Sequence, residues 1–210
     1  MLDAYLRPLV TPVLDRAGRW LARRGFTADG MTVAGFVLGI VACIAIASEA
    51  YGLAFILIAG NRIVDGLDGA VARHSRITDY GGFIDLVADF LIYAAVPFAF
   101  AIADHDRAYA AGFLILSFVG TGTTFLAFAA IAARRNMTTD RHGPKSLYYL
   151  GGLAEGTETI LVFLIMTLVP RWFDELAYGF GALCWLTTAG RVWQATLVLR
   201  DENQPPHSVG

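Results

Sequence analysis

Residues 61–89 read NRIVDGLDGAVARHSRITDYGGFIDLVAD and place four aspartates inside two otherwise apolar segments. On a helix, Asp65 and Asp68 share one face with the small residues Gly69 and Ala72, at three- and four-residue spacing. The second segment carries a matching stripe of Gly81, Asp85, Asp89 and Tyr93. Because only a short turn separates the two helices, we expect antiparallel neighbours with all four carboxylates at one depth.

The surrounding sequence is that of a membrane protein. It is 56% hydrophobic and only 16% charged, which is more apolar than an ordinary soluble domain. Residues 31–48 and 108–133 contain no charge and can each cross a hydrocarbon layer of roughly 30 Å. Four more segments are spans if a few charges are tolerated: residues 51–73, 80–103, 147–170 and 174–199. The sequence predicts an all-α, polytopic protein with six transmembrane helices, a single domain over residues 1–200 and a flexible tail at residues 201–210.

The N-terminal segment, residues 1–28, has apolar side chains at helical spacing with arginines mostly on other faces. It predicts an amphipathic helix on the membrane surface, with Pro8 and Pro12 delaying its start. The alternative is a helix packed on the bundle.

The basic residues predict the orientation of the chain. With six spans both termini share one side, and most loop and terminal Lys and Arg residues fall there, whereas Arg107 and Arg171 fall on the other. The positive-inside rule then places both termini and the aspartate cluster on the cytoplasmic side.

Four acids inside membrane helices need compensation. One acid at the centre of a span costs about 2.5–3.5 kcal/mol on insertion scales, and neighbouring carboxylates also repel one another. Arg62, one turn before Asp65, can neutralise only one of them. Hard oxygen ligands suit Mg²⁺ or Mn²⁺, and four carboxylates can hold two ions. A buried ion-pair or proton network without chemistry is the alternative.

The residues beside the acids indicate an anionic ligand. Gly69 and Ala72 leave a groove where a ligand can approach the backbone, and Arg73 at the helix end can meet a phosphate oxygen. Taken singly, such small residues favour close helix packing, and such an arginine is typical of an interface anchor. Together with the acids, they point to a diphosphate bridged by metal.

The eight positions Asp65, Asp68, Gly69, Ala72, Arg73, Gly81, Asp85 and Asp89 resemble the signature of the CDP-alcohol phosphotransferase (CDP-alcohol phosphatidyltransferase) family. The predicted spans and surface helix are also similar to that family over nearly its full length. The resemblance implies that Asp65, Asp68, Asp85 and Asp89 hold two Mg²⁺ or Mn²⁺ ions, and that Asp89 also takes the proton of the acceptor alcohol. It also implies that Gly69, Ala72 and Arg73 contact the cytidine diphosphate.

Two segments depart from the family pattern. The family enters the first span with a Pro-Asn-x-x-Thr-like sequence, and this chain keeps the threonine in Asp29-Gly30-Met31-Thr32. Asp29 and Thr32 are therefore further candidates for nucleotide binding. The loop between Arg73 and Gly81 is one residue shorter than is usual in the family, and it contains Thr78 as another candidate.

The resemblance implies a phospholipid-synthesising transferase of the membrane. An acceptor hydroxyl attacks the phosphorus of a CDP-linked lipid such as CDP-diacylglycerol, and CMP leaves. The acceptor stays open among glycerol 3-phosphate, serine, an inositol phosphate and other alcohols, and the lipid can sit on either substrate. Arg134 and Lys145, in a basic loop, and Arg191, in the last predicted span, are candidates for acceptor binding. For the loop the alternative is a topology signal, and for Arg191 an ion pair with Glu155 or Glu158.

Two other functions explain an acidic cluster in the membrane. An intramembrane prenyltransferase binds a diphosphate through metal, but its second acidic motif is expected much farther along the chain. A cation transporter is expected to bind metal without dependence on a nucleotide. The net charge of −2 gives no general attraction for nucleic acid. A homodimer is expected from the family resemblance, with Gly35 and Gly39 as a candidate packing motif.

Overall fold

The computed structural model describes residues 2–135 and 154–201, and over these ranges the chain is helical with no strand. Its α-helices are α1 (Leu2–Arg23), α2 (Ala28–Ala47), α3 (Tyr51–His74), α4 (Asp79–Ala103), α5 (Ala108–Arg134), α6 (Gly156–Leu168) and α7 (Phe173–Asp201). Short 3-10 turns, η1 (His105–Arg107) and η3 (Pro170–Trp172), precede α5 and α7. The all-helical prediction is confirmed for these residues.

Three of the helical segments are long and apolar enough to cross a membrane, at Ala28–Ala47, Asp79–Ala103 and His105–Arg134. Helices α3 and α7 carry charged residues that make them less apolar than these three segments. Helix α6, with 13 residues, is too short to cross a membrane. The predicted span at residues 147–170 is described only from residue 154 onward. The predicted tail, apart from residue 201, lies outside the described residues. The structure therefore supports a membrane protein with three candidate spans in its described part.

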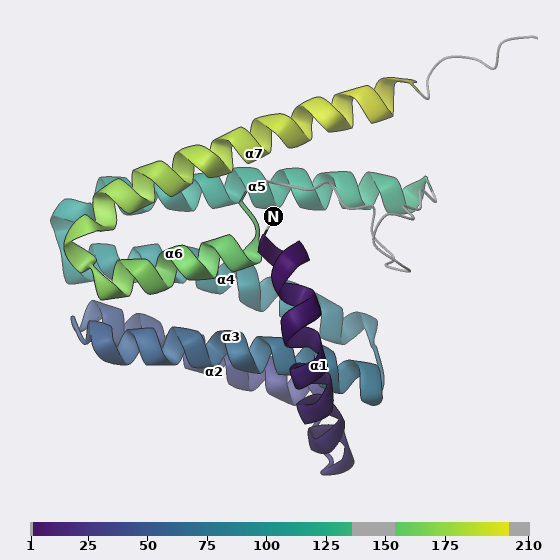
Figure 1. Cartoon of the computed structure of the whole chain (residues 1–210). Coiled ribbons are helices and arrows are strands. Elements are labelled where there is room, and N and C mark those ends of the chain that lie inside the picture. Colours follow the sequence, from purple (N-terminus) through teal and green to yellow (C-terminus); the bar gives the residue numbers. More distant parts are fainter. Residues whose placement is uncertain (1, 136–153, 202–210) are drawn as a thin grey trace, which may run out of the picture.

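The bundle has two packing layers that meet along α4. In one, α2 packs along both α3 and α4, whereas α3 and α4 make little direct backbone contact with each other. In the other, α5 packs on α4 and α7 runs beside α5 (Figure 1).

The glycines of α2 allow this helix to pack closely on α3 and α4. A Cβ on Gly39 would lie 2.5 Å from Ile92 Cδ1, and one on Gly35 would lie 3.5 Å from Val64 Cγ1. Gly35 and Gly39 thus pack inside the chain, so their assignment to a dimer interface was wrong.

Helix α1 packs against the second half of α3, which it crosses obliquely (Figure 1). A Cβ on Gly18 would lie 2.5 Å from the Ala70 Cβ, so the two backbones approach closely there. Val13 and Trp20 remain exposed. The helix begins at Leu2, so the prediction that prolines delay its start was wrong. Packing on the bundle is present, and contact with a membrane surface stays a prediction.

Candidate active site

Two adjoining cavities lie where α2 begins, α3 ends and α4 begins. Local capping fixes two of these ends. The Thr27 hydroxyl accepts a hydrogen bond from the Gly30 amide at 3.1 Å, and the Thr78 hydroxyl accepts one from the Gly81 amide at 2.9 Å. Such caps satisfy amides that the first turn of a helix leaves without partners. Helices α2 and α4 therefore both start beside the site.

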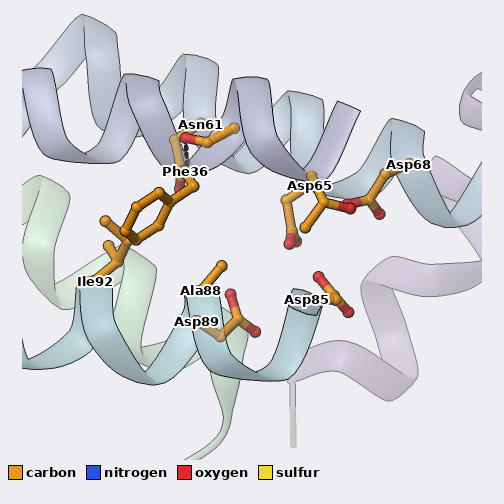
Figure 2. Close-up of a pocket in the computed structure, with 10 residues that line it drawn as sticks. Phe36, Asn61, Asp65, Asp68, Asp85, Ala88, Asp89 and Ile92 are labelled. Atoms are coloured by element: carbon orange, nitrogen blue, oxygen red, sulfur yellow. Dashed lines mark hydrogen bonds between the residues drawn. The ribbon is translucent and has the colours of Figure 1, made fainter. Parts of the chain in front are cut away.

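The inner cavity is small and has an acidic wall. Carboxylate oxygens of Asp65, Asp68 and Asp85 all lie within 4.8 Å of one another. Asp65 and Asp68 come from α3 and face Asp85 and Asp89 of α4 across the cavity (Figure 2). Asp89 lies one turn deeper than Asp85, so it lines the same cavity without joining the closest group.

Polar neighbours hold the carboxylates of α3. The Arg62 guanidinium pairs with Asp65 on its own helix. The Thr32 hydroxyl donates a hydrogen bond to Asp68 Oδ2 at 2.8 Å, which links α2 to α3 at the cavity. One arginine cannot compensate four carboxylates, because like charges at this spacing repel strongly where water is scarce.

The donor set fits a divalent cation. Ionised carboxylates only accept hydrogen bonds, and their hard oxygens are the ligands that Mg²⁺ and Mn²⁺ prefer. Asp65, Asp68 and Asp85 already bring carboxylate oxygens from two helices close enough together to bind one ion. Binding a metal here would supply positive charge that the described side chains lack.

The outer cavity is larger and more open, and it has a wall of small residues. Gly69 and Ala72 line it from α3, together with Asp29 and Thr32 from α2 and Thr78 from the cap of α4. Gly81 also lines it, and a Cβ at that position would lie 2.8 Å from Asp29 Oδ1, so the absence of a side chain lets α2 and α4 approach here. Thr32, Asp68 and Asp85 line both cavities, so the acidic site opens directly into this pocket.

Arg73 lies at the edge of the site rather than in the wall of either cavity. Its Nε is 3.5 Å from Asp15 Oδ1 of α1. Its Nη1 would lie 3.7 Å from a Cβ on Gly69. The prediction that Arg73 contacts a nucleotide stays untested, and the ion pair with α1 is a feature that the motif did not reveal.

Sequence reasoning missed two polar lining residues. Arg76, in the loop between α3 and α4, lines the outer cavity. Asn61 lines the inner one, and its Nδ2 donates a hydrogen bond to the Gly35 carbonyl at 2.8 Å. Asn61 stands four residues before Asp65, so helical spacing alone could have placed it on the acidic face.

The structure describes two of the three predicted acceptor residues, Arg134 and Arg191, and neither lines the cavities. Arg191 is buried in α7, where Nη1 donates to the Thr121 carbonyl at 3.0 Å and the guanidinium lies 5.7 Å from the Phe125 ring centroid. Arg134 is exposed at the end of α5. Lys145 lies outside the described residues.

The sequence of this chain matches a known family. A family model for CDP-alcohol phosphatidyltransferase matches residues 26–193. The chain is 49% identical to the inner membrane protein YnjF of Escherichia coli, over 96% of this chain and 98% of that protein. It is 29% identical to an archaetidylinositol phosphate synthase of Pyrococcus horikoshii, over 90% of this chain and 94% of the other.

Solved structures share the fold. The phosphatidylinositol phosphate synthase of Mycobacterium tuberculosis, crystallised with CDP-DAG bound, superposes with a TM-score of 0.65 at 20% identity. The match covers 95% of this chain and 98% of that one. A second structure of the same protein, with manganese and citrate, gives a TM-score of 0.64 at 20% identity, over 94% of this chain and 92% of the other. With its motif, cavities and family match together, this chain belongs to the CDP-alcohol phosphatidyltransferase family and is an enzyme of that class.

Proposed function

We propose that this enzyme moves a phosphatidyl group from CDP-diacylglycerol, or a closely related CDP-linked lipid, to the hydroxyl of a small alcohol and releases CMP. The continuity of the two cavities carries the proposal. Asp68 and Asp85 belong to the acidic cluster and also line the outer pocket, so a diphosphate lying in that pocket reaches the carboxylates. The bound CDP-DAG in the related mycobacterial structure supports this choice of donor.

Asp65, Asp68, Asp85 and Asp89 would hold two divalent cations, Mg²⁺ or Mn²⁺. When bound, such ions neutralise charge on a diphosphate and stabilise the leaving group. The acidic cluster in this chain and the manganese in the mycobacterial structure support this proposal.

The protein's own residues would orient the donor and handle the proton. Gly69 and Ala72 leave room for the nucleotide beside α3, and the first turns of α2 and α4, with Asp29, Thr32 and Thr78, surround it. Amides at helix N-termini favour a phosphate there. Arg73 and Arg76 would add positive charge at the pocket's edge. Asp89, one turn deeper than Asp85, would accept the proton of the attacking hydroxyl as a general base.

The acceptor we propose is a phosphorylated polyol, with an inositol phosphate as the first compound to test. Two kinds of relative support this choice, the archaeal archaetidylinositol phosphate synthase and the mycobacterial phosphatidylinositol phosphate synthase. Arg191 would bind the acceptor's phosphate, with Arg134 and Lys145 attracting it from the surface. A buried arginine is well suited to a phosphate because its planar fork donates two parallel hydrogen bonds.

The active site and both termini would lie on the cytoplasmic side of the membrane. The protein would form a homodimer. The concentration of basic residues on the predicted side of the termini supports this orientation. The alternatives of a prenyltransferase and a cation transporter lose their support, because the family match covers residues 26–193 and includes both halves of the acidic motif.

The deciding experiment is CMP release by the purified full-length protein with CDP-diacylglycerol, Mg²⁺ or Mn²⁺, and a panel of acceptors. We expect release that requires metal and is fastest with a phosphorylated polyol. Asp65→Ala is expected to release no CMP, and Asp106→Asn, an exposed aspartate beyond the opposite end of α4, serves as the matched control. No release with any acceptor would overturn the proposal, and release with serine alone would overturn the acceptor assignment.

A further inference from the structure

Helix α1 reaches the active-site end of α3 through one carboxylate. Asp15 Oδ1 lies 3.5 Å from Arg73 Nε, and Oδ2 lies 3.0 Å from His74 Nε2. Arg19, one turn later on α1, lies 3.5 Å from Oδ2. Three basic side chains therefore surround a single acid on α1, and two of them come from the last turn of α3.

The surrounding packing fixes where this carboxylate stands. One turn after Asp15, a Cβ on Gly18 would lie 2.5 Å from Ala70 Cβ and 2.7 Å from the Ala70 carbonyl carbon. One residue before Asp15, Leu14 contacts Gly66, where an added Cβ would lie 2.9 Å from Leu14 Cδ1. Because both contacts involve a glycine against a neighbouring helix, α1 has little freedom to slide along α3.

The ion pair also orients the guanidinium of Arg73. Asp15 occupies the Nε edge, and Nη1 lies beside Gly69, 3.7 Å from the position of an added Cβ. Gly69 lines the outer cavity. An arginine side chain at a helix end has many rotamers, and a carboxylate that holds Nε removes most of them.

We infer that Asp15 is a positioning residue of the active site, which holds Arg73 with its free Nη edge toward the nucleotide pocket. This inference rests on the proposed function, since it takes the outer cavity to bind the CDP group. It assigns to α1 a part in donor binding, in addition to any contact with the membrane surface. Asp15 itself would not touch the substrate.

The test is a double-mutant cycle on the full-length enzyme, with KM for the CDP-lipid and kcat measured separately by CMP release. An exposed ion pair of this kind contributes a fewfold effect, so Asp15→Asn is expected to raise KM about threefold and leave kcat unchanged. Arg73→Ala is expected to raise KM by about tenfold or more. In the Arg73→Ala background, Asp15→Asn is expected to change KM no further. Asp15→Glu, which keeps the charge, is expected to restore most of the affinity.

Two controls separate positioning from simple docking of α1. Arg19→Gln removes the partner of Asp15 on its own helix and is expected to leave KM unchanged. The melting temperature without substrate reports how far Asp15→Asn weakens the docking of α1, and a purely structural role would raise KM equally in both backgrounds. Such additive effects, or an unchanged KM for Asp15→Asn, would overturn the inference alone. If the wild type itself neither binds nor cleaves CDP-lipid, the proposed function fails first and this inference fails with it.

Discussion

The two ends of α4 are built for opposite purposes. At its end, Phe100 is fully buried, with its ring centroid 4.4 Å from that of Phe173 and 5.8 Å from that of Tyr51. At its start, Asp85 and Asp89 face α3 across a cavity. One end is closed by aromatic rings and the other is held open by small and charged side chains.

The change from one construction to the other takes place within about one helical turn. Ile92 packs on Gly39 and, with Phe36, lines the innermost part of the acidic cavity (Figure 2). Beyond this point, α4 contributes large apolar side chains to the core, among them Val96 and Phe100. Because α2 packs on both α3 and α4, it can hold them apart at the site while the aromatic end stays closed. The comparison teaches that the closely packed end positions the helices whose other ends carry the chemistry.

The largest effects are expected at the open end. Asp89→Asn removes the proposed base and is expected to lower kcat by about 10²- to 10⁴-fold, with CDP-lipid binding still measurable. Asp65→Ala is expected to lose both turnover and binding, because it removes a proposed metal ligand. CMP release and a separate CDP-lipid binding assay check the two variants. Normal turnover by Asp89→Asn would refute the assignment of the base.

The closed end is expected to govern stability rather than chemistry. Phe100→Ala leaves a cavity between Phe173 and Tyr51 and is expected to cost about 3–5 kcal/mol of stability. Thermal unfolding in detergent measures this loss, and CMP release well below the melting temperature is expected to be nearly unchanged per folded molecule. A large drop in kcat of the folded variant would show that the two ends are not separate in function.

Two glycines of α3 offer a matched comparison between the ends. Gly69 lines the outer cavity, whereas nothing lies within 4 Å of a Cβ placed on Gly52 near the start of the helix. Gly69→Leu is expected to fill space needed by the nucleotide and to raise KM for the CDP-lipid by about tenfold, which corresponds to about 1.4 kcal/mol. Gly52→Leu is expected to leave KM unaltered. Equal KM values for the two variants would argue against the outer cavity as the donor site.

The smallest expected effect is the dependence on pH of the stability that Asp15 contributes. The hydrogen bond from His74, with the charges of His74 and Arg73, lowers the pKa of Asp15 below its ordinary value of 3.8 despite an opposing effect of burial. The folded state therefore favours the ionised carboxylate. Its contribution to stability is fully present above the ordinary pKa and is lost as the pH falls through the lowered one. The difference in melting temperature between wild type and Asp15→Asn should persist at neutral pH and vanish only below about pH 4. A difference that disappeared between pH 7 and 5 would contradict this account.

The sequence predicted the elements of the site better than their connections. Helical spacing was sufficient to put Asp65, Asp68, Gly69 and Ala72 on one face, because that spacing depends only on local backbone geometry. It did not show that α2 packs between the ends of α3 and α4, nor that Thr32 donates to Asp68, since both depend on contacts far apart in the chain.

The loop after α3 and helix α1 show why other features of the site could not be predicted from the sequence. The position of Arg76 depends on the path of the turn after α3, which apolar periodicity does not specify. The pairing of Arg73 with Asp15 depends on how α1 crosses α3, and the crossing is set by Gly18 meeting Ala70. Within the described residues three helices are long and apolar enough to cross a membrane, and α3 is not among them because the charges needed at the site reduce its hydropathy.

The central claim is that the acidic cluster binds divalent ions that in turn hold the diphosphate of a CDP group. Titration of the full-length protein with Mn²⁺, followed by the loss of the free-ion signal in electron paramagnetic resonance, tests it most directly. We predict two bound ions per chain whose affinity rises when CDP is added, and no such binding in Asp65→Ala. Mn²⁺ binding that is indifferent to CDP, or that survives intact in Asp65→Ala, would contradict the account.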